Sequence, residues 1–146
     1  MSEAVTISVA GPPVAKGRAR LSTVNGHARA FTPSKTRNYE ALLRLEAGRV
    51  MDGRTPFEGP LAVRVVAYLP IPQSLSKAKR ADAIGRRLLP TKRPDLDNYV
   101  KTIDGLNEIV WRDDSQIVEL TARKVYSETP RLVVTVHPAG DGKRAA

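Results

Sequence analysis

Four short runs in which apolar residues recur at alternate positions constrain the fold of this chain more than any other feature of its sequence. The runs are residues 5–10, 61–69, 117–125 and 132–136, and β-branched residues occur in each. Alternation with a period of two is typical of a strand that buries one face. A sheet with one apolar face must be covered, so helices are expected to pack against these strands.

Two longer segments with helical spacing lie between these runs. The first is predicted to begin at Thr32–Pro33, with Thr as the N-cap and Pro as the first helical residue, and to end near Gly53. The apolar residues that recur at helical spacing in this first segment are Tyr39, Leu42, Leu43, Ala47 and Val50. The second is predicted to begin at Asp95. Its apolar face consists of Leu96, Val100, Ile103 and Val110, flanked by Tyr99 and Leu106.

The order of these segments predicts a mixed α/β (α+β) fold, in which two or three helices cover a mixed sheet of about four strands. We expect one domain over residues 1–139 and a disordered tail over residues 140–146. The chain has no cysteine, which excludes a disulfide scaffold and a cysteine-based metal site. It has neither an apolar run of ~20 residues nor a signal-peptide pattern, so a cytoplasmic protein without a membrane partner is expected.

The chain is strongly basic. It has 24 Lys and Arg residues against 15 Asp and Glu residues, a formal net charge of +9 at pH 7. This excess favours a nucleic-acid partner, although charge alone does not establish a function. The cations are densest in a predicted loop over residues 16–29 and in residues 77–93. In the second segment, Ser74 or Ser76 and Gly85 are expected to bound a short helix.

Five of the chain's aspartates gather within 20 residues, at positions 95, 97, 104, 113 and 114. One interpretation of this cluster is purely structural. Asp95 can cap the second helix, and Asp97 can form an ordinary surface pair with Lys101 four residues later. Asp113 and Asp114 can form a turn before the third strand.

The other interpretation treats the aspartates as one site. A divalent metal can activate water and neutralise a phosphate during phosphodiester cleavage, and Mg²⁺ prefers carboxylate oxygens. Lys101, one helical turn after Asp97, can stabilise the phosphate. The chain has no G-x-x-x-x-G-K-[ST] loop and no G-x-S-x-G elbow, so neither a nucleotide cofactor nor a serine nucleophile is expected.

These residues resemble a known family. Pro94-Asp95-Leu96-Asp97-Asn98, then Lys101, then Trp111-Arg112-Asp113-Asp114-Ser115-Gln116 are similar to the motifs of the RusA family of Holliday junction resolvases. The combined pattern is more specific than either part. The resemblance extends over residues 5–136, with Gly11-Pro12-Pro13 and the basic residues after it also similar.

The resemblance implies a homodimeric endonuclease of mixed α/β architecture that uses Mg²⁺, with Mn²⁺ as a possible substitute, to cut four-way DNA junctions by paired, symmetric nicks. Such enzymes act in recombination and repair, and phages or prophages frequently encode them. By resemblance, Asp95, Asp97 and Asp114 are the metal-binding catalytic carboxylates, Lys101 is the catalytic lysine and Asp113 is an additional acid. The candidate DNA contacts are Lys16, Arg18, Arg20, Lys92 and Arg93.

Two other functions fit the same sequence. A non-catalytic basic DNA-binding or architectural protein would use the aspartates only as caps and turn residues. A nuclease for flaps or forks would use the same site on a different branched DNA. Metal dependence separates the first alternative from a resolvase, and substrate preference separates the second.

Overall fold

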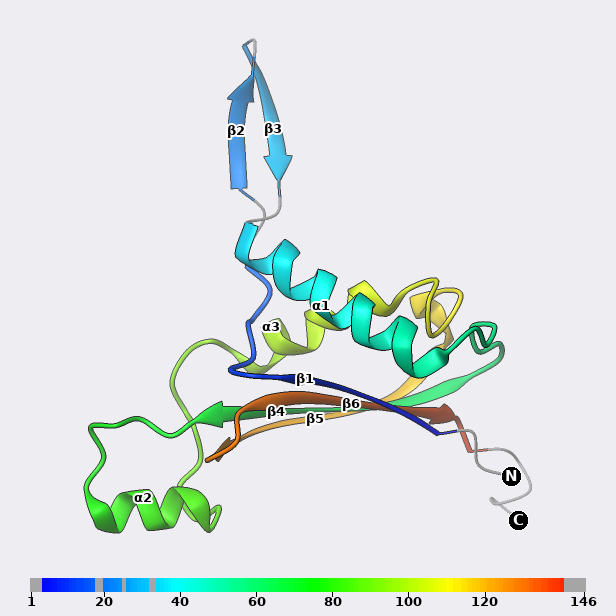
Figure 1. Cartoon of the computed structure of the whole chain (residues 1–146). Coiled ribbons are helices and arrows are strands. Elements are labelled where there is room, and N and C mark those ends of the chain that lie inside the picture. Colours follow the sequence, from blue (N-terminus) through cyan, green and yellow to red (C-terminus); the bar gives the residue numbers. More distant parts are fainter. Residues whose placement is uncertain (1–3, 18–19, 25, 32–33, 141–146) are drawn as a thin grey trace.

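A four-stranded mixed sheet forms the centre of the molecule (Figure 1). The computed structural model describes residues 4–17, 20–24, 26–31 and 34–140. The strand order is β1-β6-β4-β5, in which β6 is antiparallel to both of its neighbours and β5 is parallel to β4. These strands are β1 (Val5–Ala10), β4 (Leu61–Pro70), β5 (Ile117–Ser127) and β6 (Arg131–Pro138). The predicted mixed sheet of four strands is therefore confirmed.

Helices cover one face of this sheet. Helix α1 (Ser34–Met51) and the shorter α3 (Leu96–Val100) lie on the same side of it (Figure 1). The 3₁₀ helix η1 (Lys101–Leu106) follows α3 directly. The core between the layers includes Ile7, Leu43 and Val134, each with no exposed surface. The burial pattern of β1, alternately buried and exposed, is the predicted one.

Helix α1 differs in detail from its prediction. Its predicted start, Thr32–Pro33, lies outside the described residues. Its buried stripe advances by four residues at each step and consists of Tyr39, Leu43, Ala47 and Met51. Leu42 was predicted in this stripe but is 48% exposed, because positions 39 and 43 already occupy the covered face. The helix ends at Met51, two residues before Gly53, which has a φ of 80°.

The loop predicted over residues 16–29 is wrong in part, because the chain forms a hairpin there. Strands β2 (Arg20–Val24) and β3 (His27–Phe31) pair antiparallel and project away from the sheet (Figure 1). Val24 pairs with His27, which leaves a two-residue connection. The sequence at that point is Asn25-Gly26, the dipeptide most typical of tight hairpins, and Gly26 has a φ of 82°.

The short helix in the basic segment is confirmed. Helix α2 covers Lys77–Ile84, and the Ser76 side chain caps it by accepting a hydrogen bond from the Lys79 backbone N–H. Gly85 follows as the C-cap. The helix lies across the sheet from α1 and contacts β5 (Figure 1).

The second predicted helix is shorter than its apolar pattern suggested. Five residues are α-helical, the next six tighten into η1, and Val110 lies beyond both, although it is still buried. Close contact with α1 accompanies this change. A side chain at Gly105 would approach the Glu40 carbonyl oxygen to 3.3 Å, and Arg44 donates a hydrogen bond to the Gly105 carbonyl.

No helix in the described part of the chain is long and apolar enough to cross a membrane. The predicted tail over residues 140–146 lies outside the described residues, apart from Gly140.

Adjacent leucines in α1 provide a test of this packing. Leu43→Ala is expected to lower the free energy of unfolding by about 2–5 kcal/mol, because it leaves a cavity beneath the helix. Leu42→Ala is the matched control, and its effect is expected to stay within about 0.5 kcal/mol. Urea denaturation measures both. Equal losses would mean that the covered face of α1 is assigned wrongly.

Candidate active site

Asp95 lies at the junction between an exposed segment and α3. It occupies the N-cap position of the helix, with extended backbone angles, but its side chain makes no capping hydrogen bond. The residue is exposed. The structural interpretation of Asp95 as a capping side chain is therefore not supported, and its carboxylate is available to a ligand.

Asp97 and Lys101 form the predicted pair on the surface of α3. Asp97 Oδ2 lies 3.5 Å from Lys101 Nζ, and their side chains are 67% and 58% exposed. An exposed pair at this spacing contributes only about 0.3–0.5 kcal/mol. Both side chains can therefore exchange this contact for one with a bound ion or phosphate at little cost.

Asp114 is oriented by a buried indole. The Trp111 Nε1–H donates a 2.8 Å hydrogen bond to Asp114 Oδ1, and Trp111 has no exposed surface. This satisfies the indole donor, as a buried tryptophan requires, and it leaves the second carboxylate oxygen of Asp114 for another partner. Trp111 is thus a core residue that also fixes the direction of an exposed acid.

Asp113 has a structural role in the turn before β5. Its Oδ2 accepts a hydrogen bond from the Ser115 N–H at 2.9 Å. Hydrogen bonding with the Ser115 side chain and then with its backbone lowers the pKa of the Asp113 carboxyl group. Gln116 completes a capping box by accepting from the Asp113 N–H. The Gln116 amide also donates to the carbonyls of Phe57 and Gly59, which ties the turn to the loop before β4. The turn predicted from Asp113 and Asp114 is confirmed.

The described residues contain no group of three Asp, Glu or His side chains arranged to hold one metal ion. Asp95 and Asp97 share one loop–helix junction, whereas Asp114 lies at the entrance to β5. The chemistry of the donors nevertheless fits Mg²⁺, because all three are carboxylates and this ion often binds one or two of them together with water and phosphate oxygens. The ligand set of Asp95, Asp97 and Asp114 stays a prediction.

The fold brings three of the predicted residues to one cleft. Lys16, Arg93 and Asp95 line a cleft of about 520 Å³, together with Asn98. A 2.7 Å hydrogen bond from the Lys16 N–H to the Asn98 carbonyl holds the segment after β1 against α3. Segments far apart in the sequence thereby form the two sides of one cleft.

The charge of Lys16 is neutralised by two acidic residues of the same chain. Its Nζ lies 3.2 Å from both Glu40 Oε2 and Asp104 Oδ2. Burial lowers the pKa of Lys16, but the hydrogen bonds and charges of Asp104 and Glu40 outweigh this effect, so its pKa is raised overall. Lys16 therefore links the cleft to α1 and η1, and its role as a DNA contact stays a prediction.

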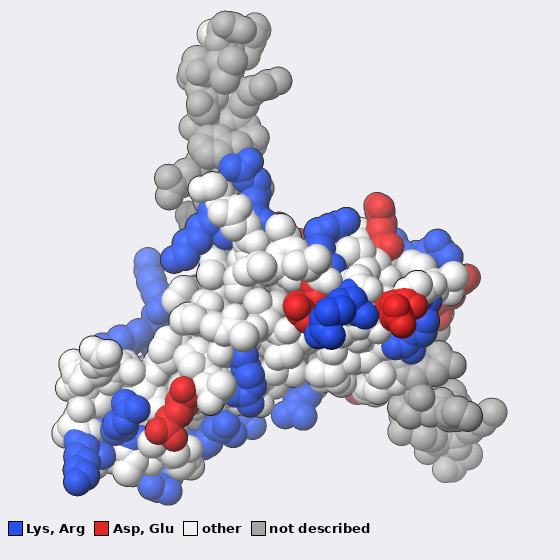
Figure 2. All heavy atoms as spheres, viewed as in Figure 1, with Lys and Arg blue, Asp and Glu red and all other residues white. Residues whose placement is uncertain are grey.

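The other predicted DNA contacts differ in how far the structure describes them. Lys92 and Arg93 are exposed and form no ion pair with any described residue. Arg20 lies in β2, and Arg18 lies outside the described residues. Basic side chains surround α2, and acidic and basic side chains alternate nearer to α1 (Figure 2). Of the predicted contacts, Lys92 and Arg93 are thus exposed cations that lie just before Asp95 in the chain.

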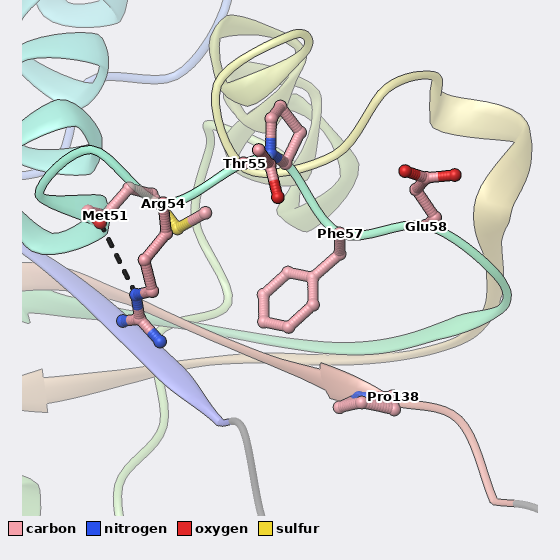
Figure 3. Close-up of a pocket in the computed structure, with 7 residues that line it drawn as sticks. Met51, Arg54, Thr55, Phe57, Glu58 and Pro138 are labelled. Carbon is pink, nitrogen blue, oxygen red and sulfur yellow. Dashed lines mark hydrogen bonds between the residues drawn. The ribbon is translucent and has the colours of Figure 1, made fainter.

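A second pocket, of about 610 Å³, lies elsewhere on the molecule, between the loop after α1 and Pro138. The Phe57 ring points into it, whereas Glu58 points away from Arg54 (Figure 3). Arg54 donates a hydrogen bond to the Met51 carbonyl. None of the predicted site residues lines this pocket.

Sequence analysis did not identify Lys124, which contacts the segment before Asp95. Its Nζ donates 2.9 Å hydrogen bonds to the carbonyls of Lys92 and Pro94. The sequence did contain one signal for this residue. Leu120, Ala122 and Lys124 occupy alternate positions of one strand, so an apolar residue is expected at position 124, where the chain has a cation.

The fold and the site define a small basic α+β protein with exposed carboxylates beside exposed cations. The comparison with known families is more specific, because the family described as Endodeoxyribonuclease RusA matches residues 10–137. This chain belongs to that family, which confirms the resemblance found in its motifs. A relative from Bacillus subtilis (strain 168), the uncharacterized protein YqaN, is 37% identical over 137 residues, 92% of this chain and 96% of the relative.

The two N-cap aspartates provide a test of their roles. Asp113→Ala removes a side chain that caps a turn, so it is expected to lower the melting temperature by about 2–4 °C. Asp95→Ala removes a side chain without a capping bond, so it is expected to shift the melting temperature by less than about 1 °C. Differential scanning calorimetry without added metal measures both. A larger loss for Asp95→Ala would favour the structural interpretation of Asp95.

Proposed function

We propose that this protein is a Mg²⁺-dependent endodeoxyribonuclease that resolves four-way DNA junctions by paired, symmetric incisions. One observation carries the proposal beyond the family. The Asp95 carboxylate stands at an N-cap without capping the helix, beside the exposed Asp97 and in the same cleft as Arg93. Within the described residues, the Asp95 side chain forms neither a capping bond nor an ion pair. An exposed carboxylate of this kind in a basic protein suits a metal that meets a phosphate.

The carboxylates of Asp95, Asp97 and Asp114 would hold the ion. Bound there, Mg²⁺ would supply a more acidic water and neutralise charge on the phosphate. The hydrogen bond from Trp111 keeps one oxygen of Asp114 occupied and its other oxygen free. Asp113 holds the turn that presents Asp114, so it acts through that neighbour.

Lys101 is the residue suited to the charged phosphate. Its Nζ is 3.5 Å from Asp97 Oδ2 and largely exposed, so it can turn from that carboxylate to a phosphate oxygen. A cation that is already in place when negative charge develops lowers the barrier without further reorganisation. Lys101 would therefore contribute to the rate of cleavage more than to the affinity for DNA.

The cations around the cleft would bind the DNA backbone. Arg93 lines the cleft. Lys92 is the residue before Arg93 in the chain, and Arg20 lies on the projecting hairpin. Contacts with phosphates place a protein on DNA without reading its sequence, which suits an enzyme that selects branched DNA by shape. Binding by these residues would weaken as the salt concentration rises.

A homodimer follows from the symmetry of the substrate. A four-way junction has approximate two-fold symmetry, and its resolution requires two matched incisions. An isologous dimer presents two identical sites, as dimeric DNA-binding proteins do on palindromes. We therefore propose that two copies of the chain act on one junction.

Cleavage of a synthetic four-way junction tests this function. The wild-type protein with Mg²⁺ is expected to make two symmetric nicks, and EDTA is expected to abolish them. Asp97→Asn is expected to lower the cleavage rate about 10²–10³-fold, because it removes a ligand of the metal that would stabilise the charge on the reacting phosphate, while junction binding persists. Asp52→Asn, the same substitution at the end of α1, is the matched control and is expected to cleave normally.

The other outcomes separate the alternatives. Junction binding without cleavage in any divalent metal would indicate a non-catalytic DNA-binding protein. Faster cleavage of a fork or flap than of the junction would indicate a different branched substrate for the same site. Cleavage by Asp97→Asn at the wild-type rate would contradict the role given to Asp97.

A further inference from the structure

A single lysine connects the edge strand of the sheet to the segment that delivers Asp95. Lys124 Nζ donates hydrogen bonds of 2.9 Å to both the Lys92 and the Pro94 carbonyl oxygens. The carbonyl of Pro94 belongs to the peptide bond that it shares with Asp95. The ammonium group therefore holds the backbone immediately before the first predicted metal ligand.

The position of Lys124 in the sheet makes this contact possible. Lys124 pairs with Ala67, which belongs to the core, so its side chain leaves β5 on the face covered by α1 and α3. Lys124 is half-buried. Its aliphatic stem can lie along apolar surface while the ammonium reaches past it. An apolar residue at this position could pack there but could not donate to the two carbonyls.

The segment has little else to hold it in place. Residues 91–95 are all exposed, so apolar packing contributes little to their position. Within the described residues, no other hydrogen bond ties residues 91–94 to the sheet. Hydrogen bonds from a charged donor are stronger than those between neutral groups. The two that Lys124 donates to the Lys92 and Pro94 carbonyls therefore restrict this segment most.

We propose that Lys124 is a positioning residue for the cleavage site, which fixes the segment 92–94 so that Asp95 and Asp97 present their carboxylates together. This inference rests on the proposed function. Lys124 touches backbone carbonyls, and it would act on the reaction through Asp95. Its loss would leave the fold intact and would let the two carboxylates move relative to each other.

Lys124→Met tests the proposal, because it keeps the aliphatic length and removes the ammonium. Amide hydrogen exchange is expected to become about 10-fold faster at Asn98, whose N–H bonds the Asp95 carbonyl, and to stay unchanged in β4 and β6. Affinity for Mn²⁺, measured by calorimetry, and kcat for junction cleavage are each expected to fall about 10–100-fold, as for other residues that support metal ligands. The Kd for the junction is expected to stay within about twofold, because no phosphate contact is lost.

Two further variants serve as controls. Arg123→Met removes the same charge from the neighbouring position on the opposite face of β5, and it is expected to leave hydrogen exchange at Asn98, Mn²⁺ affinity and kcat unchanged. Lys124→Arg keeps a charged donor and is expected to restore much of the Mn²⁺ affinity and kcat. If Lys124→Met does not fold, the same quantities are measured for Lys124→Gln, which has a neutral and shorter donor.

Unchanged hydrogen exchange at Asn98 in a folded Lys124→Met, or equal losses in Arg123→Met, would overturn the proposal. The test also separates this inference from the proposed function. If the wild-type protein cleaves no junction but Lys124→Met still loosens Asn98 and weakens Mn²⁺ binding, the positioning role holds and the proposed reaction fails. Normal cleavage by Lys124→Met with normal Mn²⁺ affinity would contradict the positioning role alone.

Discussion

Burial of one face of the four-stranded sheet beneath α1 and α3 is the constraint on which the rest of the structure depends. Covering that face brings the start of α3 against the segment that follows β1, so that Lys16 and Asp95 line one cleft. It also directs Lys124 from the edge strand toward the segment before α3. The residues of the candidate site are therefore placed by packing, although most of them lie on the surface.

Charge is distributed unevenly around this site. Part of the positive charge is neutralised within the chain, since Lys16 contacts both Glu40 and Asp104. Lys92 and Arg93 form no such pairs in the described part of the chain and remain available to an anion. The acids differ in the same way, because Asp113 is committed to a turn and Asp95 is not. Lys92, Arg93 and Asp95 are therefore distinguished by side chains that form no ion pair or capping bond within the described residues, and not by how many charges surround them.

Local patterns in the sequence predicted the four strands, α2 and the position of α1. The hairpin β2–β3 was missed although Asn25-Gly26 indicated it, because basic residues obscured its short strands. The end of the second helix was missed because Val110 continues the helical spacing of apolar residues, although α3 ends at Val100 and η1 at Leu106. The motif predicts the aspartates and Lys101 as site residues, and these roles stay predictions. Their partners depend on tertiary packing, so neither the role of Lys16 nor that of Lys124 could be read from spacing alone.

The proposed function requires that carboxylates beside exposed cations hold a divalent metal for DNA cleavage. A crystal structure of the protein with Mn²⁺ and a four-way junction, analysed by anomalous scattering, tests it most directly. The expected result is an anomalous peak bound by Asp95 and Asp97, with the second carboxylate oxygen of Asp114 completing the protein ligands and a DNA phosphate beside Lys101. A peak bound elsewhere, or a junction seated on the protein with no metal at these aspartates, would contradict it.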